Sequence, residues 1–336
     1  MDSETVVLCY PASTEDISEI QQSFPGSQIV VADQNDIGQK IHSATIFCGH
    51  AKKNQIDWQE VVANGKLRWI QSSAAGLDHC LADSVVRSGI LVSGCSGLFA
   101  NQVAEQTLAL LYGLVRRMPQ FYRQAEKKIY ERSPTDTLHG KSVGIVGFGG
   151  NGRRIAELLK DVAGKILATD SFPEFEKPGF VEVYAADQLD LLLQMSDVVV
   201  VTLPLTSCTR NLLGAEQFAT MRDGSYFINV ARGAIVDHAA LREAIKNQKI
   251  AFAGLDVIDP EPLPADSPFW EEERVVITPH VGAQSADRVS LTTRLFCENA
   301  RRLFNGKRLF NLVDKELGFP RPEHRIRFDC NGKWQL

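Results

Sequence analysis

Three polar residues in the second half of the chain have side chains suited to acid–base chemistry on a carboxylate-bearing molecule. Arg232, Glu261 and His280 each follow a short apolar run that has the length of a buried strand. A guanidinium can hold a carboxylate through two hydrogen bonds, and an imidazole can give or take a proton near neutral pH. Taken singly, each has an ordinary alternative: a surface arginine, a glutamate in a rigid acidic loop, and a loop histidine.

Together the three residues predict the interconversion of a 2-oxo acid and a 2-hydroxy acid. Arg232 would hold the carboxylate, and His280 would protonate the oxygen that develops negative charge, or act as a base in the reverse direction. Glu261 is the carboxylate that we expect beside His280, because an adjacent anion stabilises an imidazolium. The carbon centre needs a hydride donor, which the side chains themselves do not provide.

A glycine-rich segment predicts where such a donor binds. Gly147, Gly149 and Gly152 form the pattern G-x-G-x-x-G between an apolar run, 142–146, and a helical pattern, 153–162. Gly147 permits a tight turn, Gly149 lets the backbone approach a pyrophosphate, and Gly152 lets the helix pack on the strand. The first amide groups of that helix then face the phosphates.

Asp170 supplies the second part of this dinucleotide-binding pattern. It ends the next apolar run, 166–169, where a carboxylate accepts hydrogen bonds from a ribose hydroxyl and repels a 2′-phosphate. The residues that follow, 171–173, include no Arg or Lys, so the sequence favours NAD over NADP. The alternative is a glycine-rich turn with an unrelated surface aspartate.

The elements that must position these residues alternate between strands and helices along the chain. Expected strands lie at 6–9, 29–31, 45–47, 68–70 and 90–92, and then at 142–146, 166–169, 198–202, 226–230, 252–257 and 275–278. Expected helices lie at 16–24, 81–87, 101–118, 153–162, 188–195, 238–247 and 285–304. This alternation predicts an α/β protein with two doubly wound parallel sheets, the second one built from six strands.

Two segments outside the strands mark the organisation of the chain. Helix 101–118 has Asn101 as its expected N-cap and Pro119 just past its end, and it follows a small, glycine-rich junction at 93–97. After Asn311 the chain is expected to be irregular and polar, and the tail from Leu317 is expected to be a solvated or oligomer-packing extension.

Composition bounds the class of protein. The 336 residues suggest two domains, and a net charge of −5 excludes nucleic acid as the main partner. With 44% hydrophobic and 23% charged residues the chain is not disordered, and it has neither a secretory signal nor an apolar run of membrane-spanning length. Seven cysteines without a C-x-x-C pair indicate no disulfide framework and no metal site, so we expect a cytoplasmic protein.

In order and spacing, the motifs resemble the D-isomer-specific 2-hydroxyacid dehydrogenase family from about residue 45 to about residue 305. The motifs are SAAGLD at 73–78, VAE at 103–105, the glycine loop with Asp170, NVARG at 229–233, DPEP at 259–262 and TPH at 278–280. The resemblance implies a Rossmann NAD-binding domain, 100–285, inserted into a flavodoxin-like substrate domain made of 1–99 and 286–336. It also implies a homodimer.

The resemblance implies roles for individual residues. Arg232 binds and polarises the substrate, Glu261 pairs with the histidine, His280 does the acid–base work, and the backbone at Ala75 and Gly76 holds the substrate carboxylate. The resemblance also implies contacts with the cofactor: Gly150 and Asn151 at the pyrophosphate, Leu203 and Pro204 at the adenosine, and Asp256 at the nicotinamide carboxamide.

Five more residues are implied to contact the cofactor without a named part of it: Val103, Ala231, Arg232, His280 and Gly282.

Substrate and subfamily stay open at this point. Hydroxypyruvate or glyoxylate and 3-phosphoglycerate are the leading substrates, and Lys52, Lys53 and His79 are available to a phosphate. Thr202 stands where many members have His, and the length leaves no room for the regulatory domains of long phosphoglycerate dehydrogenases. One alternative is a formate-dehydrogenase-like enzyme, but that branch pairs its histidine with Gln, whereas this sequence has Glu261. The other alternative is an NAD(H)-sensing corepressor of the same fold.

Overall fold

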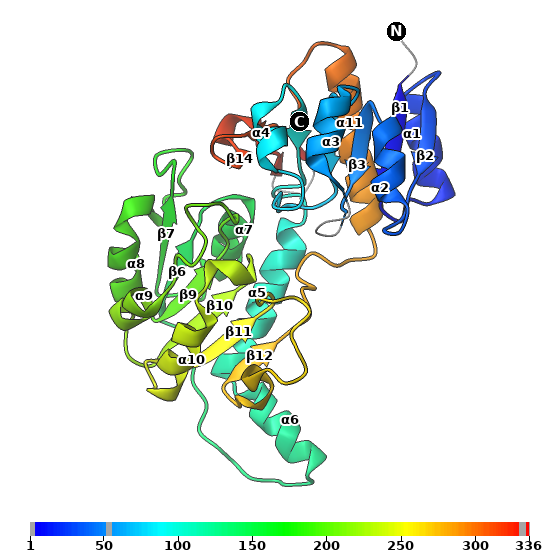
Figure 1. Ribbon diagram of the computed structural model, residues 1–336. Helices are drawn as coiled ribbons and strands as arrows, with labels where there is room; N and C mark the ends of the chain where they lie inside the picture. Colours follow the sequence, from blue (N-terminus) through cyan, green and yellow to red (C-terminus); the bar gives the residue numbers. More distant parts are fainter. Residues whose placement is uncertain (1–3, 52–55, 329–333, 336) are drawn as a thin grey trace. The chain divides into compact units, whose positions relative to one another are not determined.

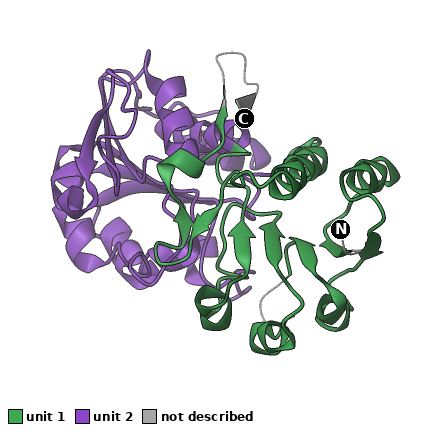
Figure 2. Ribbon diagram, turned by 90° about the horizontal axis from the view of Figure 1, so that it is seen from above, with its two compact units in different colours: residues 1–99, 285–336 green, residues 100–284 purple. Residues whose placement is uncertain are grey.

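A computed structural model describes residues 4–51, 56–328 and 334–335 of the chain. The chain forms two compact units, one made of 1–99 and 285–336 and the other of 100–284 (Figure 2). The second unit is therefore an insertion in the first, and the chain crosses between them between Phe99 and Ala100 and again between Gln284 and Ser285.

The first unit contains a five-stranded parallel sheet in the order β2-β1-β3-β4-β5, of which Figure 1 labels β1, β2 and β3. Its strands are β1 Thr5–Cys9, β2 Gln28–Val31, β3 Ile46–Gly49, β4 Trp69–Ser72 and β5 Leu91–Ser93. Apolar side chains of α1 (Thr14–Ser23) and α11 (Arg288–Phe304) bury one face. Those of α2 (Ile37–Lys40), α3 (Trp58–Asn64) and α4 (Asp83–Arg87) bury the other. This strand order is the flavodoxin-like order, so the predicted fold class is confirmed for this unit.

The second unit contains a seven-stranded parallel sheet in the order β12-β11-β10-β9-β6-β7-β8. Its strands are β6 Ser142–Val146, β7 Lys165–Asp170, β8 Glu182–Ala185, β9 Val198–Val201, β10 Ser225–Asn229, β11 Ile250–Leu255 and β12 Val275–Ile277. Counted from β6, this is the Rossmann order 3-2-1-4-5-6 with one strand added at the edge, which confirms the predicted Rossmann fold. The order reverses between β6 and β9, which is where open parallel sheets bind ligands.

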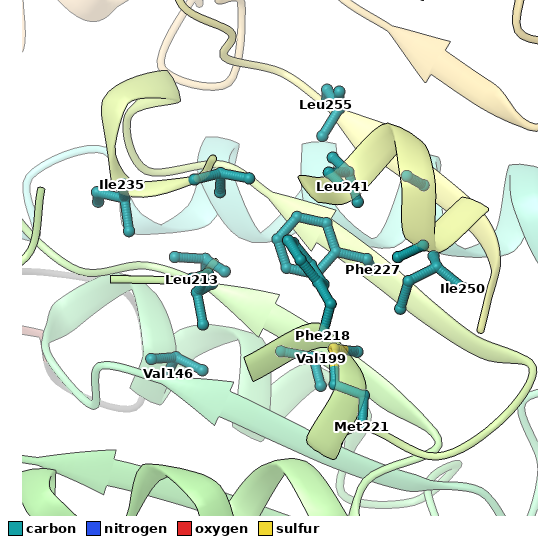
Figure 3. Packing of buried hydrophobic residues seen from close by; sticks show 14 of the residues in the cluster. Val146, Val199, Leu213, Phe218, Met221, Phe227, Ile235, Leu241, Ile250 and Leu255 are labelled. Atoms are coloured by element: carbon teal, nitrogen blue, oxygen red, sulfur yellow. The ribbon is translucent and has the colours of Figure 1, made fainter. Parts of the chain in front are cut away.

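Two apolar cores hold the second unit together, one on each face of its sheet. Helices α8 (Leu189–Met195), α9 (Ala215–Thr220) and α10 (His238–Lys246) cover one face, where Phe218 and Phe227 meet edge to face with ring centroids 5.4 Å apart (Figure 3). Helices α5 (Ala100–Val115) and α7 (Gly150–Leu159) cover the other face. Because β9 is buried on both faces, its sequence Val198–Val201 is a continuous apolar run rather than an alternating one.

Several expected elements differ from the structure. The helix expected at 101–118 ends at Val115, because Arg117 adopts a left-handed conformation with φ of 52°, and Pro119 lies in the first turn of α6 (Met118–Glu126). The second sheet has seven strands rather than six. The missed strand, β8, lies at the sheet edge with no fully buried residue, so it lacks the apolar run of a core strand. Helix α11 begins at Arg288 rather than at Ser285.

The segment after Asn311 packs within the first unit. The buried Asn311 side chain donates hydrogen bonds to the carbonyls of Gly94 (3.0 Å) and Ser96 (2.9 Å). Lys315 donates through Nζ to two carbonyls at the end of α4, and burial lowers its pKa. Strands β13 (Val313–Asp314) and β14 (Phe319–Pro320) then form a short antiparallel pair. The expectation of an irregular chain after Asn311 is therefore wrong for this part. Pro320, Pro322 and Ile326 are buried, so the tail from Leu317 is not simply solvated, and its oligomer-packing alternative stays a prediction.

Among the described residues, no helix combines the length and apolar composition that crossing a bilayer requires. No group of three or more His, Cys, Asp or Glu side chains among them is arranged to hold a metal ion. The six described cysteines are free thiols, and all except Cys208 are buried.

Candidate active site

The three polar residues predicted to do the chemistry follow three adjacent strands. Arg232 follows β10, Glu261 follows β11 and His280 follows β12, and these strands pair in parallel as neighbours (Figure 1). The carboxyl ends of parallel neighbours lie at one edge of the sheet. The fold therefore brings the three loops together, as the sequence predicted.

Glu261 and His280 form a hydrogen-bonded pair. Nδ1 of His280 lies 2.8 Å from Oε2 of Glu261, and the other carboxylate oxygen accepts the backbone N–H of Ile258 at 3.2 Å. Burial would raise the pKa of Glu261, but the hydrogen bond from His280 and the charges of His280 and Arg232 together lower it. Glu261 is thus held as an anion against one ring nitrogen.

Arg232 lies at the turn that follows β10. Its Nη1 donates to the carbonyl of Ala231 at 2.7 Å, and the side chain stays partly exposed. The turn is shaped by the buried side chain of Asn229, which accepts from the N–H of Ala231 (3.0 Å) and donates to the carbonyl of Arg232 (3.1 Å). Asn229 lies in the NVARG motif, 229–233, and had no role predicted from the sequence.

Gly233 lets the Arg232 loop approach the Glu261 loop. A Cβ atom at this position would overlap the backbone of Ile258 and Asp259, so only glycine fits here. Gly233 lies in the NVARG motif directly after Arg232, and no role was predicted for it, because the backbone that excludes a side chain there belongs to a distant segment of the chain.

The turn that carries His280 wraps around a buried carboxylate. Asp256, which is 2% exposed, accepts hydrogen bonds from the N–H groups of Val281 (3.0 Å) and Gly282 (2.8 Å) and from the Thr278 hydroxyl (2.6 Å). Asp256 and Gly282, both predicted to contact the cofactor, are thus bonded to each other. Their predicted contacts with the nicotinamide end of a cofactor stay predictions.

The glycine loop has the geometry that a dinucleotide requires. Gly147 adopts a φ of 100°, which other residues rarely reach, and α7 begins at Gly150. A Cβ on Gly152 would overlap the carbonyl of Gly147, whereas the Cα of Gly149 faces open space. The loop therefore leaves its backbone and the amino end of α7, including Asn151, open to a phosphate.

Asp170 lies at the end of β7 beside this loop. One of its carboxylate oxygens accepts the N–H of Phe148 (3.1 Å) and the other accepts the N–H of Phe172 (2.8 Å). Both bonds orient the carboxylate before any ligand binds. Asp170 is thus fixed beside the glycine loop, where the sequence predicts a ribose-binding carboxylate.

A hydrogen bond joins the segments that follow β6 and β9, where the strand order reverses. Thr202 donates its hydroxyl hydrogen to the carbonyl of Gly147 at 2.6 Å, so this threonine ties the end of β9 to the glycine loop. Leu203 lies against Gly147, and the carbonyl of Pro204 accepts a hydrogen bond from a threonine hydroxyl in the next turn. Val103, also predicted to contact the cofactor, has its side chain in the core beneath α5.

The predicted carboxylate-binding backbone lies in the first unit, after β4. Among the described residues, no acceptor takes the N–H of Ala75 or Gly76, and Ala75 is exposed. The turn before them is held by Ser72, whose hydroxyl accepts the N–H of Ala74 (3.0 Å) and lies 3.3 Å from Nε2 of His79. Lys52 and Lys53, the other cations considered for a phosphate, lie outside the described residues.

Comparison with known proteins identifies relatives over most of the chain. Residues 108–282 match the sequence model described as "D-isomer specific 2-hydroxyacid dehydrogenase, NAD binding domain". A D-3-phosphoglycerate dehydrogenase from Archaeoglobus fulgidus is 33% identical over 264 residues, which cover 78% of this chain and 50% of the relative. The chain thus spans about half the length of that protein.

Two further relatives are matched over most or all of their own length. A glyoxylate reductase from Korarchaeum cryptofilum is 33% identical over 276 residues, which cover 80% of this chain and 82% of the relative. The crystal structure of a D-isomer specific 2-hydroxyacid dehydrogenase from Xanthobacter autotrophicus, in complex with NADPH and MES, is similar with a TM-score of 0.79 at 27% identity. That similarity covers 94% of this chain and 100% of the solved one.

Replacing His280 by Gln should raise the pKa of Glu261, because the bond and the charge of His280 are what mainly lower it against burial. A carbon-13 NMR titration of the glutamate carboxyls, with Glu261 assigned through Glu261→Gln, measures this. Arg232→Gln serves as the comparison and should raise the pKa less. An unchanged Glu261 titration in the His280 variant would contradict the described pair.

The same lowered pKa sets a direction for stability. The ionised Glu261 stabilises the fold above the pKa it has when unfolded, and this contribution is lost as the pH falls through the lowered folded value. Because the Glu261–His280 pair is partly exposed, we expect it to contribute at most about 1 kcal/mol to the free energy of unfolding. The Tm of Glu261→Gln should therefore lie below that of the wild type near neutral pH and converge with it in acid.

Proposed function

Since the chain belongs to the D-isomer specific 2-hydroxyacid dehydrogenase family, we propose that it interconverts a small D-2-hydroxy acid and its 2-oxo acid. The observation that carries this proposal is the Glu261–His280 pair, 2.8 Å apart, with the charge of Arg232 close enough to affect Glu261. A proton donor held by a carboxylate beside a guanidinium suits a substrate that carries both a carboxylate and a reacting carbonyl.

In this proposal each side chain of the second unit has one task. Arg232 binds the substrate and polarises its reacting oxygen. His280 delivers a proton to that oxygen during reduction and removes it during oxidation, and Glu261 stabilises the charged imidazolium. A nicotinamide cofactor, when bound at the glycine loop, supplies or accepts the hydride at the carbonyl carbon.

The proposed substrates are hydroxypyruvate or glyoxylate, with a 3-phosphoglycerate-type acid as the second candidate. The first two gain support from the glyoxylate reductase, which matches over most of its own length. The phosphoglycerate dehydrogenase matches over only half of its length, so it supports the reaction type more than the substrate. His79 would be available to a phosphate, although its ring already lies against His50 and Ser72.

Turnover of a small panel of 2-oxo acids tests the proposal, with NADH loss followed by absorbance. Hydroxypyruvate, glyoxylate, pyruvate, oxaloacetate and phosphohydroxypyruvate make up the panel. Arg232→Ala and His280→Gln should each lower kcat/KM by about 10³-fold, because each removes a group that acts at the reacting oxygen. Arg87→Ala, an exposed arginine on α4, is the matched control and should react like the wild type. Tight NADH binding without turnover of any acid would favour a cofactor-sensing protein instead.

We further propose that NAD(H) is preferred over NADP(H), because the oriented carboxylate of Asp170 would repel a 2′-phosphate. The dehydrogenase from Xanthobacter autotrophicus was solved with NADPH, so the two cofactors must be compared directly. The wild type should favour NADH by at least about tenfold in kcat/KM, and Asp170→Asn should reduce this ratio. Asp161→Asn, an exposed aspartate just after α7, is the control. A wild type that prefers NADPH would overturn this part of the proposal.

We also propose that the chain forms a homodimer through the exposed apolar side chains of 112–130. Tyr122 and Tyr130 are 65% and 100% exposed, and Tyr112, Met118 and Ile129 lie in the same stretch. Sedimentation should give a species of twice the chain mass, and Tyr122→Glu should yield monomers. Trp270→Glu, at a 56% exposed aromatic elsewhere in the unit, should leave the dimer intact. A monomeric wild type would refute the proposal.

A further inference from the structure

The backbone of His280 adopts a conformation that non-glycine residues rarely hold. Its φ is 54°, in the left-handed region, where a side chain crowds its own carbonyl. Its N–H donates to the carbonyls of Asp256 (2.8 Å) and Thr278 (2.9 Å). Such a conformation persists only when surrounding contacts hold it, so the direction of the imidazole depends on what fixes this turn.

The Asp256 carboxylate is the anchor of the turn. It accepts the N–H groups of the two residues that follow His280, and it is nearly inaccessible to water. A buried anion with few donors is unfavourable, so its third donor, the Thr278 hydroxyl at 2.6 Å, matters for its placement.

Helix α5 determines where the Thr278 hydrogen points. Nε2 of Gln106 donates to Oγ1 of Thr278 at 3.0 Å. Because that amide already occupies a lone pair of the hydroxyl, the hydroxyl hydrogen is directed to Asp256. Gln106, Thr278 and Asp256 therefore form one directional chain that ends at the turn carrying His280.

We propose that Gln106 is a positioning residue for His280, acting through Thr278 and Asp256. The inference rests on the proposed function only in that His280 is the proton donor of that reaction. Without the amide of Gln106 the Thr278 hydroxyl can rotate away, Asp256 loses a donor, and the imidazole samples other directions. Proton transfer depends steeply on such alignment.

Steady-state kinetics of two pairs of variants test this proposal. Gln106→Leu and Thr278→Val should each lower kcat about tenfold while leaving the KM of the oxo acid unchanged. Thr278→Ser retains the hydroxyl and should keep kcat near the wild-type value. The double variant should be no worse than Thr278→Val, because both residues act in series. Gln22→Leu, the same substitution on the exposed face of α1, is the control.

A second readout does not need turnover. In protein with carbon-13-labelled histidine, the His280 ring resonance, assigned through His280→Gln, should move in Gln106→Leu and Thr278→Val and stay in place in Thr278→Ser and Gln22→Leu. An unmoved resonance in the first two variants, or a kcat equal to that of the wild type, overturns the inference. If the wild type reduces no oxo acid, the proposed function fails, and this resonance alone decides whether Gln106 positions His280.

Discussion

The parallel register of β10, β11 and β12 is the constraint on which the site depends. Asn229 pairs with Leu255, and Leu255 pairs with Ile277, so the three strands end level with one another. Short loops beyond those ends then bring a guanidinium, a carboxylate and an imidazole together without any long-range adjustment. The Arg232 and Glu261 loops can approach each other closely because position 233 is a glycine, where any side chain would push them apart.

The residues near the strand ends were predictable because each strand is a short apolar run in the sequence, and a polar loop residue stands out directly after it. Apolar runs located the core strands of both sheets, and their alternation with helices predicted two doubly wound parallel sheets. The flavodoxin-like order of the first sheet was implied by the family resemblance. The pairing of Glu261 with His280 followed from chemistry alone, since an imidazolium is stabilised by a neighbouring anion.

What escaped prediction depends on contacts that are distant in sequence. Edge strand β8 has little apolar surface to bury, and Pro119, which suggested only the end of a helix at 118, lies in the first turn of α6. The space that excludes a side chain at Gly233 and the bond from Thr202 to Gly147 join segments far apart in the chain. No residue pattern of one segment reports such a neighbour, so these features appear only when the sheet is assembled.

The bond between Gln106 and Thr278 also bears on how one domain can sit inside another. Gln106 lies early in α5, just after the chain enters the second unit, and Thr278 directly follows β12, shortly before the chain leaves it. The two ends of the insertion are therefore fastened to each other within the inserted unit. The host domain then has only a short gap to close, so its chain entropy is hardly affected by the length of the insertion. A fold so closed at its own ends can be acquired, lost or exchanged as a module without redesigning its host.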